Sequence, residues 1–204
     1  MARPQNDIWF KFDPLKVVDA ATLLLEKHGG RMKWLGLMKL LYIADKLTLE
    51  ETGQSISGDF YVSMPFGPVM SQTYDLIRSN PAYIARNKLE DALLIWNKYI
   101  EKDEAAYEVV LRTPSNYQML SRRELRILSQ VYEEKGKSDE FELVDLTHGF
   151  PEWEDPREQG VNSLPLPISR VLTLLETSPR TEEEIESLRQ EMEGQRNLEE
   201  LLGD

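Results

Sequence analysis

The sequence predicts a mainly α-helical protein: a compact helical domain with a small β-hairpin or short β element, followed by a C-terminal acidic helix. Two observations carry this prediction. Apolar residues recur at helical spacing in several long segments that begin at capping residues and end at glycine or proline. Only short stretches combine aromatic and β-branched residues in the way that strands do. With 204 residues, the chain is long enough for one sizeable core and short for two full domains.

The first two helices are the most clearly marked elements. The first is predicted to begin at Pro14, with Asp13 as its cap, and to end at His28, where an imidazole suits the negative end of the helix. The second, over 32–51, is apolar around most of its circumference, so we expect it at the centre of the domain. Asp45 interrupts this apolar surface, and a buried carboxylate needs hydrogen-bond or charge partners.

A third helix is predicted over 69–79, because Pro68 is suited to a first helical turn. The free N–H groups of a helix start favour a carboxylate. We therefore expect Asp45 to meet this helix start, with Tyr42 and His148 completing a polar cluster. The alternative is that these residues only determine the fold.

The middle of the chain leaves two alternatives open. Residues 55–64 favour a turn and a short strand. The aromatic and β-branched segments 93–100 and 106–111 favour a β-hairpin, although 89–103 also fits a helix. The range 150–167 contains four prolines and is expected to be an ordered loop.

Three further helices are predicted in the second half. Ser121 and Glu124 have the spacing of a capping box, which predicts a helix that ends near Gly136. Shorter helices are expected over 140–147 and 168–176.

Composition excludes several classes of protein. The chain has no cysteine, which removes disulfide scaffolds, cysteine-ligated metals and thiol nucleophiles. Its formal net charge of −12 disfavours broad nucleic-acid binding, and no basic recognition helix emerges. No apolar run suits a signal peptide or a membrane span, so we expect a cytoplasmic protein.

The negative charge is concentrated in the last part of the chain. Residues 181–204 hold nine acids against two arginines, a net charge of −7. Thr181 begins a second capping box, and apolar residues follow it on one stripe. We expect either a solvated or self-packing appendage, or a helix that covers a basic surface of a partner protein. The residues that would contact such a partner are Glu184, Ile185, Leu188, Glu191 and Met192.

No pattern in the sequence supports catalysis. Walker-type glycine loops and the common hydrolase and zinc-protease motifs are missing, and no carboxylate pair stands out as an acid–base couple. The chain has two histidines, His28 and His148. A hydrolase would require His148 to line an open cleft beside a nucleophile. We therefore expect no enzyme activity, no cofactor and no metal.

Four short motifs occur in a fixed order along the chain. They are Leu40-Leu-Tyr-Ile-Ala-Asp45, the single Gly53, Phe66-Gly-Pro-Val69, and Leu143-Val-Asp-Leu-Thr-His148 with Pro151 and Trp153 downstream. This order resembles the Panacea (SocA-like) antitoxin domain over about 15–175. Trp153 departs from the family pattern because one residue separates it from Pro151. The matching motif positions are Leu41, Tyr42, Asp45, Gly53, Gly67, Pro68, Val69, His148 and Trp153.

The resemblance implies a Panacea-like domain over 1–176, with 177–204 as a separate acidic amphipathic helix. It also implies an antitoxin that neutralises a cognate toxin protein by direct contact. The alternatives are a non-catalytic interaction or regulatory module of a phage or mobile element, or an adaptor that presents a toxin to a protease. We expect no direct contact with nucleic acid or membrane, and leave open a homo- or hetero-oligomer.

Overall fold

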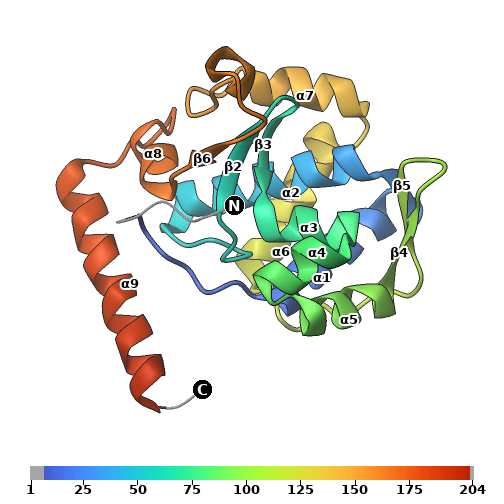
Figure 1. Cartoon of the computed structure of the whole chain (residues 1–204), viewed down its shortest axis with the longest axis horizontal. Helices are drawn as coiled ribbons and strands as arrows, with labels where there is room; N and C mark the ends of the chain where they lie inside the picture. The colour runs from blue at the N-terminus through green and yellow to red at the C-terminus, as the bar shows by residue number, and fades with distance from the viewer. Residues whose placement is uncertain (1–6, 203–204) are drawn as a thin grey trace.

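The computed structural model describes residues 7–202, except the side chain of residue 199, and is mainly helical with two small antiparallel sheets (Figure 1). This confirms the predicted fold class. The helices are α1 (Pro14–Lys27), α2 (Trp34–Thr52), α3 (Ser71–Arg78), α4 (Pro81–Asn87), α5 (Glu90–Tyr99), α6 (Arg122–Lys135), α7 (Glu140–His148), α8 (Ile168–Thr173) and α9 (Glu182–Leu202), with a 3-10 turn at Pro156–Gln159. The strands are β1 (Arg31–Lys33), β2 (Tyr61–Met64), β3 (Gly67–Met70), β4 (Ile100–Asp103), β5 (Glu108–Leu111) and β6 (Leu164–Leu166).

Helix α2 lies at the centre, as its apolar circumference predicts. It contacts α1 and α6 on one side and α7 and β3 on another. Leu37, Tyr42 and Leu49 on this helix have no exposed surface. The helix ends at Gly53, which adopts a left-handed conformation with φ of 71°.

The first sheet has the order β3-β2-β6 and lies against α2 (Figure 1). Strands β2 and β3 form a hairpin in which Ser63 is opposite Pro68. The prediction of a loop throughout 150–167 is wrong in one place: Leu164–Leu166 in this proline-rich segment forms β6, which pairs with β2. The second sheet, β1-β5-β4, closes the other end of the domain.

The prediction of a helix start at Pro68 is wrong. Gly67–Met70 forms β3, and the helix begins only at Ser71. Because β3 is an edge strand, the missing N–H of Pro68 costs no ladder hydrogen bond. Helix α4 is not among the predicted elements. Its cap is Asn80, whose side chain accepts a hydrogen bond from the N–H of Ala82.

Both alternatives for the middle of the chain are partly right. Residues 90–99 form α5, which excludes a strand over 93–99. The helix then changes at Ile100 directly into β4, and the hairpin with β5 follows. Trp96 and Ile100 are both buried, so the same apolar stripe continues from helix into strand.

The predicted caps in the second half are confirmed. Ser121 and Glu124 form the capping box of α6, which ends at Gly136. Thr181 and Glu184 exchange the same pair of hydrogen bonds at the start of α9.

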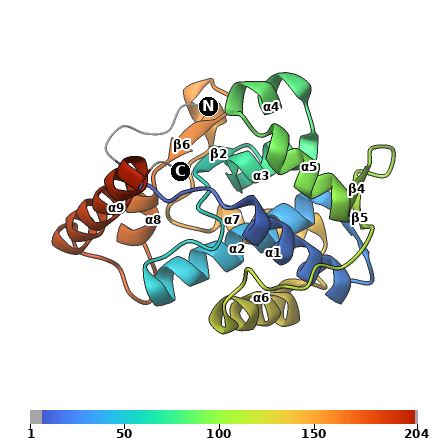
Figure 2. The same cartoon turned by 90° about the horizontal axis from the view of Figure 1, so that it is seen from below.

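Helix α9 lies along residues 7–13, which we call the N-terminal strap (Figure 1, Figure 2). Ile185 and Met192 are 7% and 4% exposed and belong to the core, and Leu188 packs against it. The acidic helix is therefore a self-packing segment, whose charged face remains outside.

The strap is bound at both of its ends. The Asp7 carboxylate accepts hydrogen bonds from the N–H groups of Ile168 (2.7 Å) and Ser169 (3.0 Å) at the start of α8. The N–H of Asp13 donates to the carbonyl of Ser57. Gly58 permits this approach, because a Cβ atom at its position would lie 1.8 Å from the Lys11 carbonyl oxygen.

Candidate functional site

Asp45 organises the loop between α2 and β2. It is 1% exposed, and its carboxylate accepts five hydrogen bonds. Oδ1 binds the backbone N–H groups of Ile56 (2.6 Å) and Ser57 (3.1 Å). Oδ2 binds three hydroxyls, those of Ser55 (2.9 Å), Ser57 (2.7 Å) and Tyr61 (2.8 Å). Hydrogen bonding alone thus satisfies this buried charge.

The expected contact between Asp45 and a helix start beside Pro68 is wrong, because no helix begins there. The carboxylate that meets the nearest helix start is Asp59. It accepts hydrogen bonds from the N–H groups of Gln72 (2.9 Å) and Thr73 (2.8 Å), in the first turn of α3, and from the Thr73 hydroxyl. Burial raises the pKa of Asp59 to about 6, and the hydrogen bonds act in the opposite direction.

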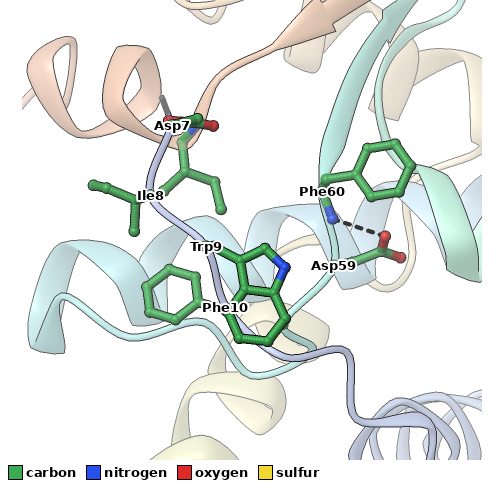
Figure 3. A pocket seen from close by; sticks show the side chains of 8 residues that line it. Asp7, Ile8, Trp9, Phe10, Asp59 and Phe60 are labelled. Atoms are coloured by element: carbon green, nitrogen blue, oxygen red, sulfur yellow. Dashed lines mark hydrogen bonds between the residues drawn. The ribbon is translucent and has the colours of Figure 1, made fainter. Parts of the chain in front are cut away.

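Sequence reasoning missed Asp59 because Ser-Gly-Asp-Phe reads as an ordinary turn. Only the fold brings this turn beside α3. The strap lies beside it: Figure 3 shows Trp9 and Phe10 next to Asp59 and Phe60, and these four residues line one small space. The enclosed space is about 30 Å³, room for a water molecule and too small for a cofactor.

Gly67 lies where α2, β3 and α7 meet. Its φ is +92°, and a Cβ atom there would lie 2.7 Å from both the Lys39 amine and the Thr147 hydroxyl. A side chain is therefore excluded by conformation and by space. Lys39 has no exposed surface, and its amine donates to the Pro68 carbonyl at 2.9 Å. Burial lowers the pKa of Lys39 to about 7.

The buried Lys39 should make stability depend on pH. An unfolded lysine titrates near 10.4, so between about pH 7 and 10 the unfolded chain binds a proton that the folded chain lacks. The free energy of unfolding therefore rises with pH in this window, by at most about 1.4 kcal/mol per pH unit from this group. Lys39→Met should remove this rise in the free energy of unfolding, which urea titrations between pH 6 and 10 measure.

The matched control is Lys98→Met, since Lys98 is exposed on α5. This variant should keep the wild-type pH profile. Parallel profiles for Lys39→Met and the wild type would contradict the depressed pKa.

His148 ends α7 and stacks on Trp153, with ring centroids 4.0 Å apart and an angle of 12°. The Trp153 indole N–H donates to the Met64 carbonyl, and the His148 ring bonds to the Pro65 carbonyl. Burial lowers the pKa of His148, and the nearby Lys39 charge adds to the shift. His148 Nε2 is buried and has no hydrogen-bond partner within the described residues. The ring therefore joins α7 to the β2–β3 turn, close to the Lys39 amine and the Thr147 hydroxyl that also surround Gly67.

Tyr42 does not complete a cluster with His148 as expected. Its hydroxyl donates to Glu152 at 2.9 Å, and Lys46 binds the same carboxylate at 2.8 Å. Glu152 has no exposed surface, and the Lys46 amine lies 3.9 Å from the Phe150 ring centre. Burial and the Glu152 charge raise the pKa of Tyr42. No sequence pattern marks Glu152, which lies in a loop beside other acidic residues.

The remaining motif residues shape the core. Leu41 and Val69 are 3% and 2% exposed, and the Tyr42 ring meets the Tyr61 ring edge-on at 5.2 Å. Tyr61 in turn binds Asp45, so a chain of contacts connects the Asp45 loop with the Glu152 pair. On α9, Glu184 and Glu191 are exposed while Ile185 and Met192 are covered by the chain itself.

Two kinds of feature, metal-ligand groups and membrane-spanning helices, are absent from the described part of the chain. Over residues 7–202 no group of three or more histidine, aspartate or glutamate side chains is arranged to hold a metal ion. No helix in that range is long and apolar enough to cross a bilayer.

Comparison with protein families matches residues 37–154 to the family described as antitoxin SocA-like, Panacea domain. This match spans more than half of the chain. The chain belongs to the SocA-like Panacea family. No curated protein and no solved structure matches it significantly.

The Panacea match covers a continuous part of the fold, from α2 to the loop after α7. It includes all nine motif positions, and with them Lys39, Asp59 and Glu152. The match is shorter than the 15–175 that the motifs indicated. Helix α1, strands β1 and β6, and helices α8 and α9 lie outside the matched residues.

Proposed function

We propose that this protein is an antitoxin that neutralises a cognate toxin protein by direct binding, without catalysis. The membership of the Panacea family carries the proposal. The polar residues of the motifs support it, because their hydrogen bonds are directed inward and hold loops in place. Rigid loops on a helical core suit a binding scaffold.

Co-expression with the adjacent gene tests the proposal. The neighbour alone should arrest growth, and this chain should restore growth and co-purify with it. A harmless neighbour, or rescue without a complex, would contradict it. Purified toxin should also be inhibited at equal molar amounts without a protease, which separates direct neutralisation from an adaptor role.

The acidic face of α9 is the proposed steering surface for the toxin. Its apolar stripe is occupied by the chain itself, whereas Glu184 and Glu191 are exposed, as are Leu198, Leu201 and Leu202 near its end. Many toxins act on RNA or nucleotides and carry basic surfaces. An exposed negative helix attracts such a surface over a distance of about 10 Å at 0.1 M salt.

Neutralising charges on α9 should slow toxin binding without changing the fold. The triple variant Glu183→Gln, Glu191→Gln, Glu193→Gln keeps the buried stripe intact. We expect its association rate with the toxin, measured by stopped-flow, to fall on the order of tenfold at low salt. The difference should shrink at 0.5 M salt.

The control removes three exposed acids elsewhere: Glu133→Gln, Glu158→Gln and Glu176→Gln. It has the same net charge as the α9 variant. Equal rates for the two variants would mean that overall charge, and not the α9 face, steers association.

A further inference from the structure

A groove of about 420 Å³ lies on the face of the β3-β2-β6 sheet that is turned away from α2, beside α3 and α4. Figure 2 shows where β2 and these two helices lie. Val62 and Met64, alternate residues of β2, form its floor. The groove contains none of the family-motif residues. We call it the tyrosine–arginine groove, after the side chains of its walls: Tyr74, Arg78, Tyr83 and Arg86.

The two walls repeat one arrangement. Helix α3 contributes Tyr74 and, one turn later, Arg78, while α4 contributes Tyr83 and then Arg86. Residues three and four apart lie on the same helix face, so each helix directs a tyrosine–arginine pair toward the groove. The Arg78 guanidinium lies 5.8 Å from the ring centres of Trp34 and Tyr74, which orients it by cation–π contact.

The arginines of the groove differ from most others in the described chain. Most of the described arginines form an ion pair with a carboxylate: Arg31, Arg112, Arg126, Arg157, Arg170, Arg180, Arg189 and Arg196. Within residues 7–202, Arg78 and Arg86 form none. The one acid of the lining, Asp75, accepts a hydrogen bond from the Asn87 amide at 2.6 Å. Burial raises the pKa of Asp75, while this hydrogen bond and the nearby Arg86 charge act in the opposite direction, so one acid faces two arginines. The groove is thus a positively charged hollow in a chain of net charge −12.

We propose that the tyrosine–arginine groove binds a short acidic segment of the toxin partner. This rests on the proposed function and specifies a contact surface for it. Two guanidinium groups recognise carboxylates by paired N–H donors, and the apolar floor accepts an aliphatic side chain between them. The volume is in the lower part of the range of small-ligand sites, so the segment is an extended loop or a chain end, not a helix.

The groove suits carboxylates better than nucleic acid. Single-stranded nucleic acid needs a basic surface that follows many phosphates, with aromatic rings for successive bases. Here only two arginines line the groove together with Val62 and Met64. The net charge of −12 of the chain repels a polyanion. Asn162 and Ser163 close one end with neutral donors.

The first test uses the purified full chain and a defined probe. A fluorescein-labelled peptide that alternates glutamate with leucine should bind at least tenfold more tightly than its glutamine–leucine counterpart, in anisotropy titrations at low salt. Arg78→Gln with Arg86→Gln should weaken binding at least tenfold, and Arg86→Gln alone should weaken it several-fold. Circular dichroism and thermal unfolding verify that each variant is folded.

Arg122→Gln with Arg123→Gln is the matched control, because these exposed arginines of α6 also lack an ion pair within the described residues. It should bind the peptide as the wild type does. Equal binding of the glutamine peptide, unchanged binding by the groove variant, or tighter binding of a single-stranded oligonucleotide would overturn the proposal.

A second test separates this proposal from the antitoxin function. If the wild type does not bind the neighbouring gene product, the proposed function fails and the peptide titration still decides the chemistry of the groove. If the wild type and the groove variant bind that product equally well, the antitoxin function holds and the groove proposal fails.

Discussion

Replacing Asp45 by alanine should lower the free energy of unfolding by about 3–5 kcal/mol. Five donors lose their acceptor at once, and each buried group left unsatisfied costs about 1–3 kcal/mol before water enters. Urea unfolding followed by tryptophan fluorescence measures the change.

Asp45→Asn should cost about half as much, because of the nature of the donors. The amide oxygen can still accept hydrogen bonds from the N–H groups of Ile56 and Ser57. The three hydroxyls at the other oxygen can rotate, so two of them can accept hydrogen bonds from the two N–H groups of the new amide. Asp139→Ala removes an exposed cap with two hydrogen bonds and should cost about 1 kcal/mol. Losses at Asp45 no larger than at Asp139 would contradict the central role of this carboxylate.

Glu152→Ala should destabilise the protein by a similar amount, about 3–5 kcal/mol, for a different reason. The substitution leaves the Lys46 amine buried without its counter-ion. Breaking one side of a buried ion pair usually costs that much, since the remaining charge has lost its solvation. The same urea titration measures the loss.

The double variant Lys46→Met, Glu152→Met separates an unpaired charge from general loss of packing. It should lose only about 1–2 kcal/mol, mainly because the Tyr42 hydroxyl loses its acceptor. An exposed pair gives the second comparison: Arg31→Ala should cost much less than Glu152→Ala, because solvent screens the Arg31–Glu108 pair. A double variant as unstable as Glu152→Ala would mean that the pair contributes through shape and not through charge.

These two carboxylates illustrate what the sequence could and could not predict. The position of Asp45 on an apolar helix indicated a buried charge that needed partners, and that prediction is correct. Its partners depended on the loop conformation, because residues 55–61 fold back over α2. Glu152 lies more than a hundred residues from Lys46, and no local pattern marks such a pair.

The elements that were predicted wrongly share one physical cause: tertiary contacts decided them. Proline suits both a first helical turn and an edge strand, so Pro68 alone did not distinguish them. The pairing of Ser63 with Pro68 decides for the strand, and this is a tertiary contact. In the same way, Ile100 continues an apolar stripe from α5 but pairs with Leu111, and the hairpin ends the helix. Helices with capping boxes were predicted correctly because their signal lies within four residues.

The N-terminal strap has a consequence for the order in which the chain folds. Its first anchor, Asp7, binds the start of α8, 161 residues further along the chain. Helix α9 follows α8 in the chain, and its residues Met192, Gln195 and Arg196 line a crevice with the strap. During translation the Asp13 end of the strap can bind Ser57 early, whereas Asp7 has no partner until residues 168 and 169 have left the ribosome. Loop closure over this distance is slow compared with local helix formation. Until then the strap is held at its Asp13 end only, so the Asp7 end is fixed later than the central helix α2.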